Sequence, residues 1–295
     1  MKSLKKLYEE KYKLLLIIPI ALLLLSIIQV GVQYSTTGDF VSKGVSLKGG
    51  STITINQEFT DPEITSLEQS LETNFPLAEI SIRELSSAGS MIGISIDSDA
   101  QDTEEINALS STVEELTGVS SEDFSIEVMG SSLGESFFQQ TKWVLLIAFL
   151  LMGVVVFAYF RSIVPALAII LAAVSDLFVT LAIFNLTGSK LGTSGIAAFL
   201  MLIGYSVDTN ILLSTRLLKK KDGTVIERAY GALSTGLTVT ATTLAVLTIA
   251  FVLVESEVVK QIMLILLIGL AVDMIMTWIQ NMSILRIYLE RKKQK

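Results

Sequence analysis

Six long apolar stretches constrain this chain most, because each is long enough to cross a lipid bilayer as a helix. The hydrocarbon core of a bilayer requires about 20 predominantly apolar residues in helical conformation. Windows of about that length find candidate spans at residues 14–33, 143–160, 163–186, 193–214, 232–254 and 258–280. Charged residues make up only 17% of the chain, against about 25% of an ordinary soluble domain. The sequence therefore excludes a soluble globular protein and predicts a multi-pass membrane protein.

The basic residues are distributed unevenly around these stretches. The chain has 22 lysines and arginines, and 16 of them lie in four places. These places are the segment before the first stretch, the connection between the second and third stretches, the connection between the fourth and fifth stretches, and the segment after the sixth stretch. The positive-inside rule assigns those 16 to the cytoplasm. We therefore expect cytoplasmic ends at 1–13 and 281–295, an external segment at 34–142, and the second to sixth spans within 143–280. The first span is expected to be a retained anchor, because residues 26–30 offer no signal-peptidase site.

The segment 34–142 has the periodicities of a folded domain rather than of a disordered acidic tail. It carries 19 acidic residues and 4 basic ones. Its apolar residues recur at strand or helix spacing, predicting a strand over 45–56 that is broken at Gly49-Gly50, further strands over 78–82, 92–96 and 124–128, and helices beginning at 61 and 102. The β-α-β-β-α-β order is typical of a ferredoxin-like domain. We expect an all-α six-helix membrane bundle with an external α+β ferredoxin-like domain inserted after the first span.

Three aspartates fall inside the apolar stretches: Asp176, Asp208 and Asp273. An aspartate at mid-membrane costs about 2.5–3.5 kcal/mol, so each is expected to face the bundle interior or a wet cavity. Asp273 shares a helical stripe with further polar residues, Thr277, Gln280 and Asn281. No lysine or arginine lies deep within the stretches, so the carboxyl groups are expected to be neutral. Each could load and release a proton or cation, or be a structural group that hydrogen-bonds between helices.

The fourth stretch has polar residues on two faces and is therefore not expected to face lipid. Tyr205 and Asp208 lie on one face, while Ser206 and Asn210 lie on another about 160° away. Arg216 follows two turns after Asp208, near the expected cytoplasmic edge. We take Asp208, with Tyr205, Asn210 and Arg216, as the first candidate for a proton relay. Asp176 and Asp273 are further candidates with fewer polar neighbours in the sequence.

Several classes of chemistry are absent from the sequence. The chain has no cysteine and no histidine, which excludes disulfides, thiol nucleophiles and cysteine-ligated metals. It contains no phosphate-binding or dinucleotide-binding motif, and the segments around its membrane aspartates lack the Gly-x-Gly-Asp and Tyr-Asp motifs of intramembrane aspartyl proteases. We therefore expect no enzymatic activity, no catalytic residue, no metal, no cofactor and no nucleic-acid partner.

Three motifs carry a family resemblance. Two flank the external domain, Leu47-Lys48-Gly49-Gly50 at its start and Gly130-Ser131-Ser132-Leu133-Gly134-Glu135 at its end. The most specific is Gly204-Tyr205-Ser206-Val207-Asp208-Thr209-Asn210, which continues to Arg216. With these motifs, and with one span before the external domain and five after it, the chain resembles the SecD/SecF family of the resistance-nodulation-division (RND) superfamily. Many bacterial members carry Asn-Asp in place of Asp208-Thr209, and this departure would fit an archaeal origin.

The resemblance implies an RND-type fold in the cell membrane and a role in protein export. The small external domain is similar to that of the family's smaller subunit. The implied partners are SecD, the Sec translocation channel, the translocating polypeptide and membrane lipids, and the implied energy source is the proton-motive force. Two alternatives stay open at this stage: a half-size RND-type exporter of small molecules or lipids, and a purely structural subunit.

Overall fold

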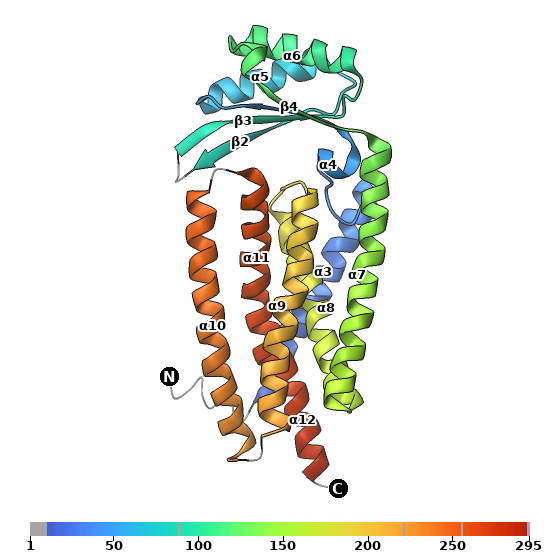
Figure 1. The fold of residues 1–295 in the computed structure, drawn as a ribbon, viewed down its shortest axis with the longest axis vertical. Coiled ribbons are helices and arrows are strands. Elements are labelled where there is room, and N and C mark those ends of the chain that lie inside the picture. The colour runs from blue at the N-terminus through green and yellow to red at the C-terminus, as the bar shows by residue number, and fades with distance from the viewer. Residues whose placement is uncertain (1–10, 88–89, 221, 255, 294–295) are drawn as a thin grey trace.

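The computed structural model describes residues 11–87, 90–220, 222–254 and 256–293. Long helices stand side by side as a bundle, and a small sheet with two helices covers one end of it (Figure 1). The bundle helices are α3 (Ile17–Thr37), α7 (Ser131–Phe160), α8 (Ile163–Leu186), α9 (Thr193–Leu218), α10 (Val225–Leu253) and α11 (Glu257–Ile275). Residues 1–10 and 294–295 of the expected cytoplasmic ends lie outside the described residues.

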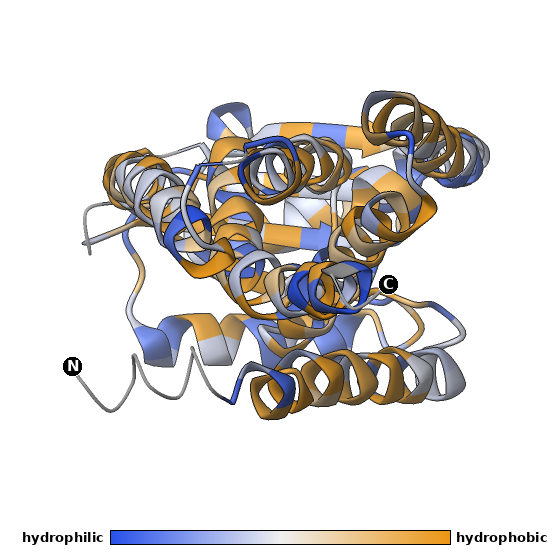
Figure 2. Ribbon diagram, turned by 90° about the horizontal axis from the view of Figure 1, so that it is seen from below, coloured by the Kyte–Doolittle hydropathy of each residue, from blue (hydrophilic) through white to orange (hydrophobic). Residues whose placement is uncertain are grey.

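The described part of the chain has six helices that are long and apolar enough to cross a membrane. This confirms the prediction of a multi-pass membrane protein. Hydrophobic residues, in orange, predominate along the helices when the bundle is seen from below (Figure 2). Several helices are longer than the apolar stretches that predicted them, because α7 begins at Ser131 and α10 at Val225.

The last helix of the bundle is interrupted by a wider turn. Helix α11 runs into the π-helix η2 (Met276–Asn281), and α12 (Met282–Lys293) continues from it. Near the end of α12, the Glu290 carboxylate accepts a hydrogen bond from the hydroxyl of Tyr12, in the short helix α2 (Tyr12–Leu15) before α3. The beginning of the first span and the end of the last therefore meet at the end of the bundle opposite the sheet (Figure 1).

The segment between α3 and α7, which the sequence predicts to be external and which is called the external domain below, contains a four-stranded antiparallel sheet with two helices on the face away from the bundle (Figure 1). The strands are β1 (Gly50–Ile55), β2 (Ser81–Ser87), β3 (Ser90–Ser98) and β4 (Ser125–Met129), and the helices are α5 (Asp61–Asn74) and α6 (Thr103–Thr117). Their spatial order is β2-β3-β1-β4. The order of these elements along the chain is the predicted one, β-α-β-β-α-β, although residues 88–89 between β2 and β3 lie outside the described residues.

Local interactions account for the start of α5 and for the end of α6. At the start of α5, the Thr60 backbone N–H donates a 2.7 Å hydrogen bond to the Glu63 carboxylate. This bond lowers the pKa of Glu63 and satisfies one of the free N–H groups at the helix start. Helix α6 follows Asp102 and ends at Gly118, whose φ of 71° is in the left-handed region that glycine tolerates.

The core of the domain lies between the sheet and its helices. Ile53 pairs with Ile96 on one side and with Ile126 on the other, so the three side chains point to the same face of the sheet. The buried core residues are Ile53, Ile55, Ile64, Leu67, Leu71, Ile94, Ile96, Leu109 and Val113. The apolar pattern identified these positions, but Leu116, Ile126 and Val128, which follow the same spacing, are 43%, 40% and 52% exposed.

The strand predicted over residues 45–56 is wrong in its first part. Val45–Lys48 forms the short helix α4, and the strand begins only at Gly50. Gly49 and Gly50 have φ angles of 91° and 130°, which side-chain-bearing residues rarely adopt. The glycine pair is the predicted break, but a helical turn precedes it where the pattern predicted strand.

Gly49 and Gly134 allow α4 to pack closely against the start of α7. A Cβ atom on Gly134 would lie 2.9 Å from the carbonyl carbon and oxygen of Leu47, and a Cβ on Gly49 would collide with Ser131. Leu47 itself is completely buried. The two motifs that flank the external domain in the sequence therefore pack against each other and anchor the domain to α7.

We predict that Gly134→Val destabilises the protein, because the backbone of Leu47 has no room to move away from the added side chain. Overpacking of this kind costs about 1–3 kcal/mol, and thermal unfolding of the purified protein in detergent measures the loss. The matched control is Gly31→Val, since a Cβ at Gly31 has no neighbour within 4 Å. Equal melting temperatures for Gly134→Val and the control would show that this contact is not needed for stability.

Candidate functional site

A cluster of polar side chains lies in the middle of the bundle, where α8, α9 and α11 meet. Asp176 comes from α8, Ser206 from α9, and Asp273 from α11. All three side chains are completely buried, as is Thr277 at the start of the π-helix η2. The cluster therefore draws on three helices that are separated along the chain but packed together at this depth.

Hydroxyl groups satisfy most of the carboxylate oxygens in this cluster. Ser206 Oγ donates to Asp176 Oδ2 at 2.5 Å. Asp273 accepts from Thr209 Oγ1 at 2.9 Å through Oδ2 and from Thr277 Oγ1 at 2.8 Å through Oδ1. Asp176 Oδ1 is buried and has no hydrogen-bond partner. One oxygen of the cluster is thus free to hold a proton or to accept a further hydrogen bond.

The two carboxyl groups are direct neighbours and interact electrostatically. Within the described residues, no lysine or arginine forms an ion pair with either of them. Two negative charges this close are strongly unfavourable when both carboxyl groups are buried in the bundle and form no ion pair with a lysine or arginine of the described residues. The pair Asp176–Asp273 is therefore expected to retain at least one proton, which gives the bundle a protonatable centre.

The π-helix turns further polar groups towards the neighbouring helices. Gln280 Nε2 donates to Ser175 Oγ of α8 at 3.2 Å, and Asn281 Nδ2 donates to Asn210 Oδ1 of α9 at 2.5 Å. Asn210 Nδ2 in turn donates to the Ser206 carbonyl oxygen at 2.7 Å. Single π turns inside α-helices are frequently found at functional sites. Here the π turn extends the network of Asp273 across both adjacent helices.

Asp208 does not belong to this cluster. Its side chain is exposed on the surface of α9, and Tyr205 on the same face is 38% exposed. Among the described residues neither Arg216 nor any other group forms an ion pair or hydrogen bond with Asp208. Asp208 was expected to face either the bundle interior or a wet cavity, and the first of these is wrong: Ser206 and Asn210 take the inward face of α9, which turns Asp208 outward. Its role in a proton relay stays a prediction.

Sequence reasoning underestimated Thr209, which donates to Asp273 from the turn after Ser206. The available signal was its spacing of three residues from Ser206, which puts both hydroxyls near one face of the helix. Of the remaining motif residues, Gly204 lies on the exposed face of α9. Gly49, Gly50 and Gly134 lie at the junction of α4 and α7, and Leu133 beside them is 62% exposed.

Gln261 of α11 links the helix that carries Asp273 to the external domain. Its Oε1 accepts from the backbone N–H groups of Gly192 at 2.9 Å and Gly195 at 3.0 Å, and its Nε2 donates to the Lys190 carbonyl oxygen at 2.7 Å. Lys190 Nζ donates to Ser81 Oγ, at the start of β2, at 2.9 Å. A polar cavity of about 320 Å³ lies between the sheet and this connection. The α8–α9 connection is therefore held from below by α11 and touches the sheet above.

We predict that Thr209→Val destabilises the protein by about 1–3 kcal/mol, the usual cost of leaving a buried polar group unsatisfied. Valine keeps the shape of threonine but removes the hydroxyl that donates to Asp273. Thermal unfolding in detergent measures the change. Thr235→Val is the matched control, because the Thr235 hydroxyl is bonded only to the Gly231 carbonyl of its own helix. A Thr209→Val variant as stable as this control would show that the hydrogen bond from Thr209 to Asp273 does not stabilise the protein.

Comparisons with known proteins identify the family of this chain. Residues 109–291 match the family described as "Protein export membrane protein SecD/SecF, C-terminal". Relatives called "Protein-export membrane protein SecF" match nearly the whole chain. The one from Pyrococcus furiosus is 34% identical over 99% of this chain and 96% of its own length, and the one from Methanocaldococcus jannaschii is 35% identical over 97% and 99%.

A solved structure has the same fold. The crystal structure of SecDF, "a translocon-associated membrane protein" from Thermus thermophilus, superposes with a TM-score of 0.75 at 19% identity. The match covers 96% of this chain but only 38% of the SecDF chain. The chain described here therefore corresponds in fold to a minor part of that longer protein.

Proposed function

The chain belongs to the SecD/SecF family of protein-export membrane proteins, and we propose that it acts as the SecF subunit of a complex with SecD. In this proposal the complex assists Sec-dependent translocation of polypeptides across the cell membrane and draws on the proton-motive force. The role is non-enzymatic. The bundle is of the RND type, and the external domain is ferredoxin-like, which its strand order β2-β3-β1-β4 supports.

The observation that carries the proton-coupling proposal is the buried pair Asp176–Asp273. A carboxyl pair that cannot hold two charges gains or loses a proton as one unit. Ser206, Thr209 and Thr277 position the two groups and would repack when the charge of the pair changes. One charge moved through 100 mV provides about 2.3 kcal/mol. A few protons per cycle would therefore be sufficient to shift a packed helix between two arrangements.

The connection through Gln261 supports transmission of such a shift to the external domain. Asp273 and Gln261 are on the same helix, and Gln261 holds the loop whose Lys190 reaches Ser81 of the sheet. A movement of α11 along its axis would displace this loop, because the Gln261 side chain is hydrogen-bonded to the backbone of Lys190 and Gly192 in the loop and of Gly195 in the first turn of α9. The sheet would then tilt relative to the bundle.

The outward position of Asp208 supports a second six-span partner. A carboxyl group facing lipid costs about 2.5–3.5 kcal/mol, so the surface around Asp208 is better covered by protein. Helix α10 also presents a row of exposed hydroxyl residues, and those of Thr235, Thr238 and Thr242 bond only to carbonyl groups of α10 itself. We assign both surfaces to the contact with SecD.

We predict that Asp176→Asn and Asp273→Asn still fold and co-purify with SecD but lose the stimulation of export by the proton-motive force. Asparagine keeps the size and one of the two acceptor oxygens while removing the titration. The measurement is the export rate of a secreted reporter in cells, with and without an uncoupler. Asp222→Asn, an exposed position in the α9–α10 connection, is the matched control. Uncoupler-sensitive export at wild-type rates in both bundle variants would exclude this pair as the relay.

The same export assay tests whether Asp208 takes part in the proton relay. If it belongs to the relay across the subunit contact, Asp208→Asn loses the uncoupler-sensitive part of the export rate while SecD binding remains. Asp208→Glu would retain part of that rate. Wild-type export by Asp208→Asn would limit the relay of this subunit to the buried pair.

We predict that the external domain lies outside the cell and that the end of α12 lies in the cytoplasm, as the distribution of basic residues requires. The chain has no cysteine, so single introduced cysteines report without background. Ser111→Cys on α6 and Lys292→Cys on α12 are both exposed positions. In intact cells a membrane-impermeant maleimide should label only the Ser111→Cys variant. Labelling of the Lys292→Cys variant alone would show that the chain has the opposite orientation in the membrane.

A further inference from the structure

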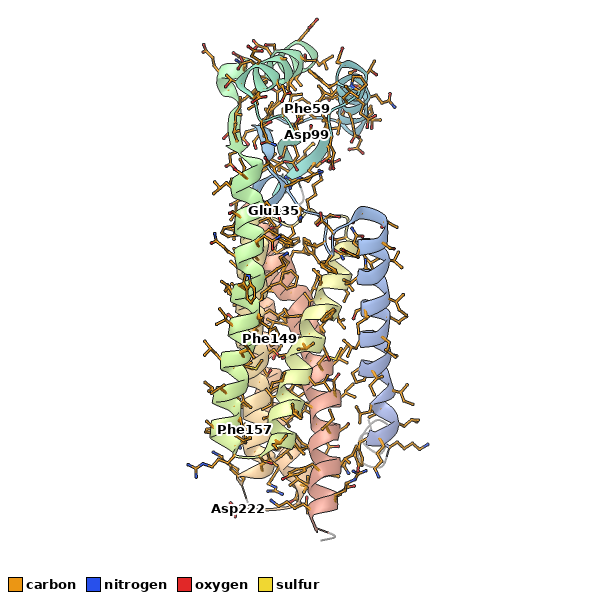
Figure 3. The ribbon with its side chains drawn as sticks, turned by 90° about the vertical axis from the view of Figure 1, so that its right-hand side faces the viewer. Phe59, Asp99, Glu135, Phe149, Phe157 and Asp222 are labelled. Carbon is orange, nitrogen blue, oxygen red and sulfur yellow. The ribbon has the colours of Figure 1, made fainter. Side chains whose placement is uncertain are left out.

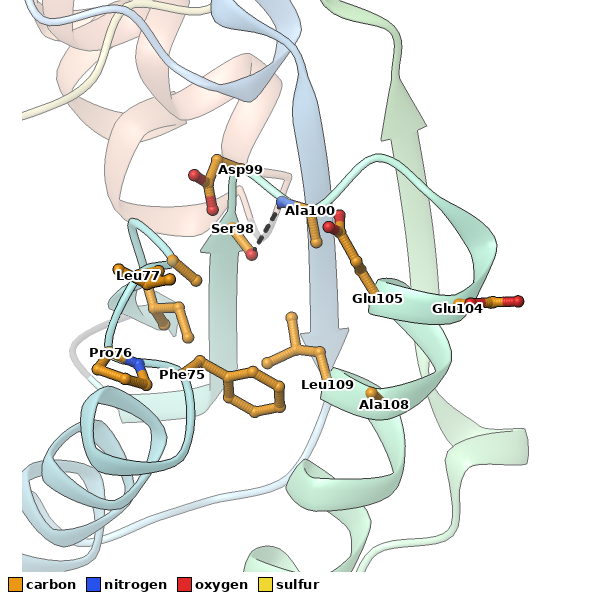
Figure 4. Close-up of a pocket in the computed structure, with 12 residues that line it drawn as sticks. Phe75, Pro76, Leu77, Ser98, Asp99, Ala100, Glu104, Glu105, Ala108 and Leu109 are labelled. Carbon is orange, nitrogen blue, oxygen red and sulfur yellow. Dashed lines mark hydrogen bonds between the residues drawn. The ribbon is translucent and has the colours of Figure 1, made fainter.

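A groove of about 570 Å³ crosses the external domain between the loop that follows α5 and the start of α6. Phe75, Pro76 and Leu77 form one wall, and Ala108 and Leu109 of α6 form the other (Figure 4). Both walls are mainly apolar. Figure 3 places this part of the domain, marked by Asp99, far from the end of the bundle marked by Asp222.

Leu77 is the most exposed large apolar side chain among the described residues, at 98% exposure. A single exposed leucine is common on protein surfaces. Leu77 differs because it stands at the edge of a groove whose opposite wall includes the buried side chain of Leu109. A ligand in the groove would cover Leu77 and remove apolar surface from water, which favours binding.

Negative charge surrounds the apolar walls. Asp99, Glu104 and Glu105 line the groove, and no lysine or arginine does so among the described residues. Figure 4 shows Asp99 and Glu105 on either side of Ala100, with Glu104 farther out along α6. Asp99 Oδ1 accepts from the backbone N–H of Glu79 at 3.0 Å, which fixes its position beside the groove. The groove therefore complements a ligand that is both apolar and positively charged.

We infer that this groove binds extended polypeptide segments in which apolar side chains alternate with lysine or arginine. The inference rests on the proposed function, which brings unfolded polypeptide to this side of the membrane. An unfolded segment exposes the apolar side chains that a folded protein buries. Apolar walls with an acidic rim thus select unfolded basic segments over folded proteins and over acidic segments.

The test measures binding of a short fluorescent peptide that alternates lysine with valine to the full chain in nanodiscs of uncharged lipid. Fluorescence polarisation reports binding, and empty nanodiscs give the background from lipid. A second peptide carries glutamate in place of every lysine. The expected result is saturable binding of the lysine peptide, and binding of the glutamate peptide that is weaker by about tenfold or more because like charges repel.

Two variants and a matched control locate the site. Leu77→Ser is expected to lower the affinity for the lysine peptide by about tenfold, because one leucine contact that the bound peptide buries is lost. The double variant Glu104→Gln/Glu105→Gln is expected to lower the affinity for the lysine peptide by about fivefold, as the loss of two exposed ion pairs would do. The difference in affinity from the wild-type chain should be smaller at high salt, because salt screens exposed charges. Glu114→Gln/Glu115→Gln removes the same charge from the same helix outside the groove and should leave the affinity unchanged.

Equal affinity in all variants, or no binding to the wild-type chain, would overturn the inference. A photo-reactive residue at Ala108 in the complex with SecD supplies a second outcome. Cross-linking to the lysine peptide supports the assignment, whereas cross-linking only to SecD or to a second copy of this chain makes the groove a subunit contact and overturns it. Peptide binding is measured without a proton gradient, so failure of the groove and failure of proton coupling are distinguishable.

Discussion

A carboxyl group inside a membrane has no water to hydrate it, and this constraint organises the centre of the bundle. Asp176 and Asp273 meet it through hydroxyl donors on two other segments, Ser206 and Thr209 of α9 and Thr277 of η2. The bonds from Ser206 and Thr209 join different helices and so fix their rotation and depth relative to each other, whereas the bond from Thr277 lies within the continuous α11–η2 helix and orients the Asp273 side chain. The packing of α8, α9 and α11 is therefore determined by polar groups as much as by the apolar residues around them.

The same helices determine how the external domain is held. Gln261 is on α11 and closes the α8–α9 connection on which the sheet rests, while the close contact of Gly134 with Leu47 fixes the other attachment to α7. One attachment is a hydrogen-bond network and the other is close backbone packing. The first can rearrange by exchanging hydrogen bonds, whereas the second resists movement because no atoms can approach further. A domain held in this way would tilt about the α7 attachment.

Local sequence patterns predicted much of the structure. The periodic isoleucines and leucines identified the strands, the helices and the core of the external domain, because amphipathic periodicity depends only on which face is covered. The polar stripe of Asp273, Thr277, Gln280 and Asn281 was also visible in the sequence. The π turn within it was not, because its wider geometry depends on contacts with Ser175 of α8 and Asn210 of α9. Val45–Lys48 was misassigned for a similar reason, since its packing on α7 decides its conformation.

The sequence by itself determined that the chain crosses the membrane, how often it does so, and that three aspartates must be sheltered from lipid. Hydrophobicity and charge act residue by residue, so they can be read without coordinates. Only the tertiary structure decided which aspartates meet. It pairs Asp176 with Asp273 and leaves Asp208 on the outer face of α9. That choice depends on the rotation of each helix about its axis, and the rotation is set by contacts between segments far apart in the chain.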